Sequence, residues 1–154
     1  MQSRISHTAC GLALLVAVSS SERTARQNTV WQADIQIRTL EVTQTKRSMS
    51  VRVVIYTEND DEARNARLLF LLPVGVGIER LGTGCIASPG PSNVPALRAA
   101  VTCDLGGIPN HGFREVAITT TLPTEGLAKR IGVFAYSATP DPVPGNNYAE
   151  RIVP

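Results

Sequence analysis

The chain has 154 residues, of which 43% are hydrophobic and 5% aromatic, and its formal net charge at pH 7 is +2. This length accommodates one domain, and the composition is that of a globular protein rather than a disordered or membrane-spanning one. The basic side chains are almost all arginine and lie scattered along the chain, with lysine only at positions 46 and 129. A nucleic-acid-binding surface needs clustered positive charge, so we expect no nucleic-acid partner.

The N-terminus has the layout of a secretory signal peptide. Its first seven residues are polar and include Arg4, and residues 9–18 form an unbroken run of small and apolar side chains followed by three serines. Ten residues are too few to cross a bilayer as a helix, but they match the apolar region of a signal peptide. The alternative is that this run forms a buried helix or strand at the start of the domain.

This layout divides the chain into three parts. We expect a signal-peptide helix at residues 1–20, a polar spacer at 21–31 and a folded domain at 32–154. The mature protein would then be secreted, periplasmic or attached to the cell surface, without a membrane span of its own.

The number of cysteines in the expected mature chain is consistent with export. Cys10 lies within the expected leader, so an even pair, Cys85 and Cys103, remains in the mature chain. In an oxidising compartment we expect this pair to form a disulfide bond. The alternative is two unpaired buried thiols.

Short segments of alternating apolar residues, separated by turn signals, run from Trp31 to the C-terminus. Eight strand candidates are recognisable, at residues 35–42, 51–55, 68–72, 76–78, 101–105, 116–120, 131–136 and 148–153. This pattern predicts an all-β fold, an immunoglobulin-like antiparallel β-sandwich of seven or eight strands, with no helix after the leader.

Further patterns predict a bulge, a fully buried strand and two loops. The apolar positions change parity between Ile37 and Leu40, which predicts a bulge or a strand that passes between sheets. The continuous apolar run 68–72 predicts a strand buried on both faces. We expect loops at 58–65, which is polar, and at 82–96, which is rich in Gly, Pro and Ser.

Several short motifs, in their order along the chain, resemble one known family. They are Ala33-Asp34-Ile35, Tyr56-Thr57-Glu58-Asn59, Leu71-Leu72-Pro73-Val74-Gly75-Val76, the two cysteines, and the corner from Asp141 to Asn147. Together they resemble a conserved-repeat β-sandwich domain of unknown function from bacterial cell-surface proteins, which is related to bacterial cell-adhesion-related domains. The resemblance covers residues 33–153 and implies a bacterial surface module. Members usually occur in tandem, whereas this sequence holds one copy.

Catalytic constellations are missing from the sequence. After removal of the leader, His111 is the one remaining histidine, which leaves too few ligands for a usual zinc or copper site. His111 is followed by Gly112 in a turn-like segment, where an exposed polar residue is common. A base in a catalytic triad needs a nucleophile beside it, and no such pattern is present. We therefore expect no enzymatic activity.

The acidic loops suggest one candidate site. In an immunoglobulin-like topology, the loops at 58–65, 106–112 and 140–147 share one end of the sandwich. They carry Glu58, Asp60, Asp61, Glu62, His111, Asp141, Asn146 and Asn147. Carboxylate and amide oxygens suit calcium, so this end is a candidate calcium-binding or partner-binding pole. The alternative is a hydrophilic loop end whose Asp and Asn side chains shape turns.

These observations favour a non-enzymatic module, with an interaction or structural role, that binds a protein or a cell-envelope component through loops or a sheet edge. The alternative is a small secreted module that binds calcium or a glycan through the acidic loops. Glycan binding usually needs a row of exposed aromatic side chains, and the chain is poor in aromatic residues. We expect no cofactor other than, in that alternative, calcium.

Overall fold

A computed structural model of the protein describes residues 30–58, 61–73, 75–89, 97–123 and 130–153. The expected signal peptide and most of the expected spacer lie outside these residues, so both remain predictions. Within the described ranges, no helix has the length and apolar character needed to cross a membrane.

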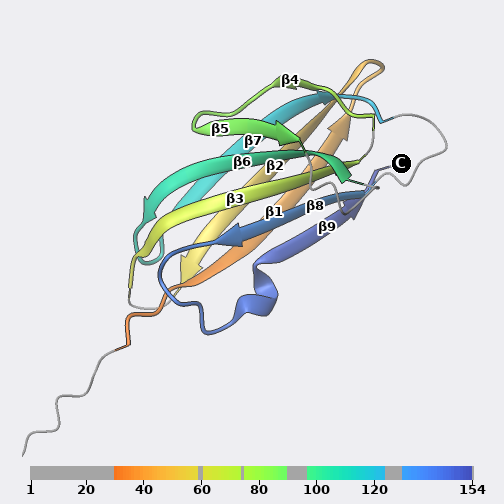
Figure 1. Ribbon diagram of the computed structural model, residues 1–154. Helices are drawn as coiled ribbons and strands as arrows, with labels where there is room; N and C mark the ends of the chain where they lie inside the picture. Colours follow the sequence, from red (N-terminus) through yellow and green to blue (C-terminus); the bar gives the residue numbers. More distant parts are fainter. Residues whose placement is uncertain (1–29, 59–60, 74, 90–96, 124–129, 154) are drawn as a thin grey trace, which may run out of the picture.

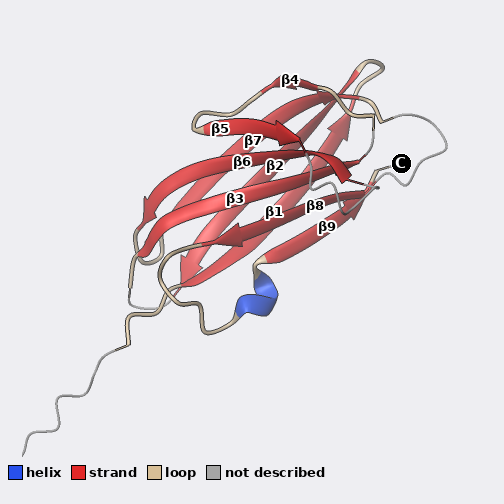
Figure 2. Ribbon diagram, in the orientation of Figure 1, coloured by secondary structure: helices blue, strands red, loops and turns tan. Residues whose placement is uncertain are grey.

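The fold is a sandwich of two antiparallel sheets (Figures 1 and 2). The four-stranded sheet has the order β1 (Asp34–Gln44), β2 (Ser48–Glu58), β7 (Phe113–Thr121) and β4 (Ile78–Arg80). The five-stranded sheet has the order β5 (Cys85–Pro89), β6 (Leu97–Ile108), β3 (Ala63–Pro73), β8 (Arg130–Tyr136) and β9 (Tyr148–Ile152). The predicted all-β antiparallel sandwich is confirmed. The described residues form nine strands rather than the predicted seven or eight, because β5 forms where a loop was expected, and they include one short 3₁₀ helix, η1 (Pro144–Asn146).

The core lies between the two sheets and is filled by alternate residues of each strand. In β2, Met49, Val51, Val53 and Ile55 are fully buried, while the residues between them lie on the outer face. This period of two is the geometry of a strand that packs on one side.

The prediction that residues 68–72 are buried on both faces of the sheet is wrong. Leu68, Phe70 and Leu72 are fully buried, but Leu69 and Leu71 are half-buried on the outer face of the five-stranded sheet. The apolar run does not lie between two packed layers, because only one face of this sheet is covered by the other sheet.

The predicted bulge is confirmed. The register of β1 on β2 shifts between Ile37 and Thr39, so that Arg38 is the extra residue. The shift allows Ile35 and Leu40, which differ in parity, both to face the core.

The predicted disulfide between Cys85 and Cys103 is present, with both residues buried. The two cysteines lie directly opposite each other on β5 and β6, so the bond joins neighbouring strands of one sheet. The expected loop at 82–96 is wrong in part, because residues 85–89 form a strand although they include Ser and Pro. Pairing with β6 outweighs the low strand propensity of these residues.

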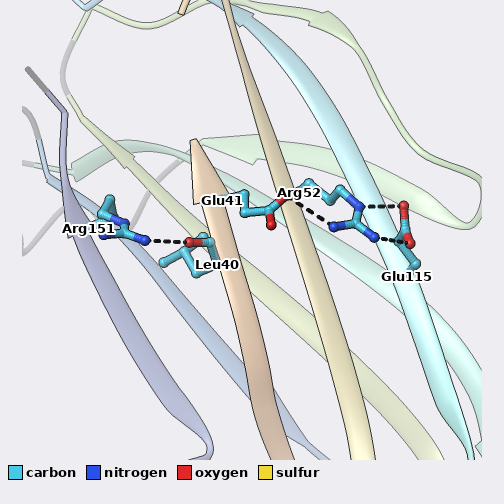
Figure 3. Close-up of polar contacts among 5 residues, drawn as sticks. All are labelled: Leu40, Glu41, Arg52, Glu115 and Arg151. Carbon is cyan, nitrogen blue, oxygen red and sulfur yellow. Dashed lines mark hydrogen bonds and ion pairs between the residues drawn. The ribbon is translucent and has the colours of Figure 1, made fainter. Parts of the chain in front are cut away.

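The edges of the two sheets meet along β1 and β9. The guanidinium of Arg151 in β9 donates a hydrogen bond to the backbone carbonyl of Leu40 in β1, at 3.2 Å (Figure 3). Near the start of β1, the amide of Ala33 donates to the carbonyl of Pro140, in the β8–β9 connection, at 3.1 Å. These bonds close one side of the sandwich.

Candidate functional site

The three loops predicted to share one end of the sandwich lie together at its lower end in Figure 1. The hydroxyl of Thr57 donates to the carbonyl of Pro109 at 2.6 Å, which links the end of β2 to the β6–β7 turn. The amide of Arg64 donates to the hydroxyl of Thr139 at 3.1 Å, which links β3 to the β8–β9 connection. Hydrogen bonds therefore hold these loops to one another.

Two of the predicted carboxylates at this end bind backbone amides. Asp141 accepts hydrogen bonds from the amides of Ile35, at 2.9 Å, and Val143, at 2.7 Å, through different oxygens. Asp61 accepts one from the amide of Gln32, at 2.8 Å. These side chains therefore satisfy donors of the surrounding turns.

The other predicted acidic residues are more dispersed. Glu58 lies in β2, where its carboxylate accepts from the Gln36 amide group at 2.8 Å and lies 3.8 Å from the Arg38 guanidinium. Glu62 is exposed, and its backbone carbonyl accepts from Thr139 at 2.8 Å. Asp60 lies outside the described residues.

His111 is exposed and adopts a positive φ of 55° in the β6–β7 turn. Its Nδ1 lies 2.9 Å from the hydroxyl oxygen of Tyr56, on the outer side of β2. This position matches the expected exposed turn residue.

Among the described members of the predicted pole, Asn147 is buried and Asn146 is half-buried. Asn146 donates to the carboxylate of Asp34 at 2.8 Å, and Asn147 is 4% exposed. The side-chain oxygens of both asparagines are buried without a hydrogen-bond partner in the described structure. Within the described ranges, no three side chains of His, Cys, Asp or Glu gather closely enough to hold a metal ion.

A second surface carries most of the exposed aromatic side chains of the five-stranded sheet. Leu69 of β3 lies opposite Phe134 of β8, and Phe134 lies opposite Tyr148 of β9. Since directly opposed residues share a face, the three side chains form a row across the strands. The row continues toward the other edge through Thr102 of β6 and Ile86 of β5.

Tyr136 adds a third ring next to this row. Its ring centroid lies 5.9 Å from that of Phe134, and the two rings are inclined by 21°. Phe134 is 38% exposed and Tyr148 is 49% exposed. We call the surface formed by Phe134, Tyr136 and Tyr148 the aromatic face.

The charged groups beside the aromatic face are paired. Arg130 donates to Glu150 at 2.6 Å, and the Tyr148 hydroxyl donates to the same carboxylate at 2.9 Å. Burial, together with the negative charge of Glu150, raises the pKa of Tyr148 above its ordinary value. The Tyr148 hydroxyl and its partners therefore give the apolar rings a hydrogen-bonding rim.

The aromatic face was not among the sites predicted from the sequence. The parity of Phe134 and Tyr136, opposite to that of the core residues Ile131 and Val133, was the available signal. Tyr148 joins them through the register of β8 on β9, which the sequence pattern did not specify.

Comparisons with known proteins give no family. No family model and no curated protein sequence matches the chain, so the resemblance to the cell-surface domain remains a prediction. Among solved structures, the chain is similar to a CBM3 module of Hungateiclostridium clariflavum, with a TM-score of 0.45 and 9% identity over 71% of this chain and 95% of that chain.

The chain is also similar to part of a GH20 exo-β-N-acetylglucosaminidase from Vibrio harveyi, solved in complex with N-acetylglucosamine. The TM-score is 0.31 and the identity 10%, over 81% of this chain and 18% of the enzyme. These distant likenesses identify neither a family nor a ligand for this chain.

Proposed function

We propose that this chain is a non-enzymatic, immunoglobulin-like binding module that acts outside the cytoplasm and binds a cell-envelope or extracellular polysaccharide on its aromatic face. The observation that carries the proposal is the grouping of three aromatic side chains on the outer face of β8 and β9. Aromatic rings can stack on the apolar C–H face of a sugar, and polar groups beside them can bind its hydroxyls.

The chemistry of the face supports this class of ligand. The rings present apolar surface, and an exposed apolar patch bordered by polar side chains is typical of an interaction site. The ion pair of Arg130 with Glu150 offers both donors and acceptors without an excess of charge. An uncharged polyhydroxyl ligand satisfies such a border better than a purely apolar partner.

The proposal also includes the compartment. The disulfide of Cys85 with Cys103 supports an oxidising environment, in which polysaccharides of the cell envelope are accessible. The expected signal peptide would supply the route of export.

A retention assay on insoluble cellulose, chitin and peptidoglycan tests the proposal. The double variant Phe134→Ala/Tyr148→Ala should lose at least about fivefold in affinity, since each stacked ring contributes roughly 0.5–1.5 kcal/mol. Phe113→Ala is the matched control, because Phe113 is an exposed ring on the opposite sheet. Equal retention of all three proteins, or no retention of the wild type, would contradict polysaccharide binding. Retention instead by a protein of the envelope that depends on Phe134 would favour a protein partner.

A second candidate function is calcium binding at the loop end. The buried, unpartnered side-chain oxygens of Asn146 and Asn147 support it, and the side chain of Asn146 lies beside the carboxylate of Asp34. A thermal melt at millimolar calcium should then rise, and Asn147→Ala should remove the rise. An unchanged melting temperature of the wild type would exclude the site.

A further inference from the structure

A polar hollow of about 540 Å³ lies on the other sheet, where the chain leaves β4 and passes β7. Its lining includes Ser50, Arg80, Thr83, Glu115, Ala117 and Thr119. None of these residues belongs to the aromatic face, so the hollow is independent of the proposed polysaccharide site.

Strand register brings two hydroxyls and one guanidinium together in this hollow. Ser50 of β2 lies opposite Thr119 of β7, and Thr119 lies opposite Arg80 of β4. Adjacent strands are about 4.8 Å apart, so three donor-bearing side chains follow one another across the sheet. Together they can surround a small acceptor group from one side.

The charges in the hollow are unequally paired. Glu115 accepts from Arg52 through both carboxylate oxygens, each at 2.7 Å, and Arg52 also contacts Glu41 at 3.0 Å (Figure 3). These hydrogen bonds to Arg52 lower the pKa of Glu115, so its charge persists but is neutralised locally. Arg80 is exposed and has no ion pair with a carboxylate among the described residues.

We propose that this hollow binds a single oxyanion group, such as a phosphate or a carboxylate. The guanidinium of Arg80 would supply the charge and a planar pair of donors, as arginine does for phosphate and carboxylate groups elsewhere. The hydroxyls of Ser50 and Thr119 would donate to the remaining oxygens. The oxyanion is either a free ion or an acidic group on a larger molecule, and two probes separate these sources.

Titration of the full chain with inorganic phosphate and with glucuronate, followed by calorimetry or NMR, tests the site. Arg80→Gln should weaken binding about tenfold or more, because a charge-assisted hydrogen bond is lost. Thr119→Val should weaken it by a smaller factor. Glu115→Gln should strengthen it, since a neighbouring negative charge is removed.

Arg47→Gln is the control, because Arg47 is exposed at the tip of the β1–β2 hairpin. Arg80→Lys keeps the positive charge and should retain part of the affinity. This variant therefore distinguishes a loss of binding caused by the missing charge from a loss caused by unfolding. Binding of phosphate alone would identify a site for the free ion, and binding of glucuronate alone a site for a saccharide acid. Affinity that is the same in Arg80→Gln and in wild type, or no binding of either probe, would overturn the proposal. The Phe134→Ala/Tyr148→Ala variant should bind both probes normally.

Discussion

The outer faces of the two sheets differ in how far their side chains satisfy one another. On the four-stranded sheet, Arg52 of β2 binds Glu41 of β1 and Glu115 of β7, so three strands are linked by ion pairs (Figure 3). On the five-stranded sheet, Phe134 and Tyr148 stay partly exposed, with no further layer of the described chain above them. The same alternation of inward apolar residues therefore supports two outer surfaces of different chemistry.

This difference follows from which residues occupy the outward positions. The inward positions of β2 and β8 are mostly apolar, because both strands fill the same core. Their outward positions bear none of that constraint and are free to carry recognition chemistry. Substitutions at inward positions should therefore change stability more than substitutions at outward positions.

The largest effect is expected from an inward aromatic residue. Phe70→Ala should destabilise the protein by about 3–5 kcal/mol, because Phe70 is fully buried and its removal leaves a cavity. Phe134→Ala should cost only about 1 kcal/mol, since part of its ring already contacts water. Urea unfolding of both variants gives the two free energies. Equal costs would mean that the aromatic face stabilises the fold as strongly as the core does.

The next largest effect is expected from the disulfide. Replacement of Cys85 and Cys103 by alanine should lower the free energy of unfolding by about 3 kcal/mol, because the bond closes a loop of 18 positions. Hydrogen exchange should rise first in β5, at the edge of the sheet that carries the aromatic face, and little in β4 of the other sheet. Unchanged exchange in β5 would show that strand pairing alone holds this edge.

A smaller effect on stability is expected when the pH is lowered, because the ion pair of Arg52 with Glu115 is then lost. Arg52 lowers the pKa of Glu115 below its ordinary value near 4.5, so the pairing contributes stability above that pH. The contribution is lost as the pH falls through the lower pKa of the folded state. The melting temperature should therefore decrease less between pH 5 and roughly 3 in Glu115→Gln than in wild type. The difference should shrink in high salt, as it does for exposed ion pairs. Identical pH profiles would indicate that the ion pairs are energetically neutral.

The smallest effect is expected from alkali at the aromatic face. Burial and Glu150 raise the pKa of Tyr148, so its protonated form is favoured in the folded state. The associated stability is present below the ordinary tyrosine value of 10.0 and is lost as the pH rises through the folded-state pKa. An absorbance titration should show one late-titrating tyrosine in wild type, which shifts to lower pH in Glu150→Gln. A titration unchanged by the substitution would show that Glu150 does not contribute to the raised pKa of Tyr148.

Local patterns in the sequence predicted much of the fold. Alternation in residues 51–55 gave the core positions of β2, and the parity change after Ile37 gave the bulge in β1. The pairing of Cys85 with Cys103 followed from their number and the expected compartment. These features depend on short-range spacing or on counting, which a single sequence records.

Features that depend on long-range register were less accessible. Strand β5 pairs with β6 along its whole length, and its own residues gave no strand signal. The row from Leu69 to Tyr148 joins three strands from distant parts of the chain. The hollow near Arg80 likewise depends on the register of β4 on β7, across 39 positions between Arg80 and Thr119. At the loop end, the alternative that Asp side chains shape turns fits the bond of Asp141 to the amide of Val143. The bonds of Asp141 to Ile35 and of Asp61 to Gln32 join distant parts of the chain, and the sequence did not indicate them.

The disulfide within the β5–β6 hairpin also has a mechanical consequence. If the chain is stretched from its two ends, the bond transmits the force directly from Cys85 to Cys103. The chain between the two cysteines therefore cannot be extended. A fully extended residue spans about 3.5 Å, so the 18-position separation removes roughly 60 Å from the reach of the pulled chain. Only a reductant would release that length, which makes the extensibility of the molecule a function of the redox state around it.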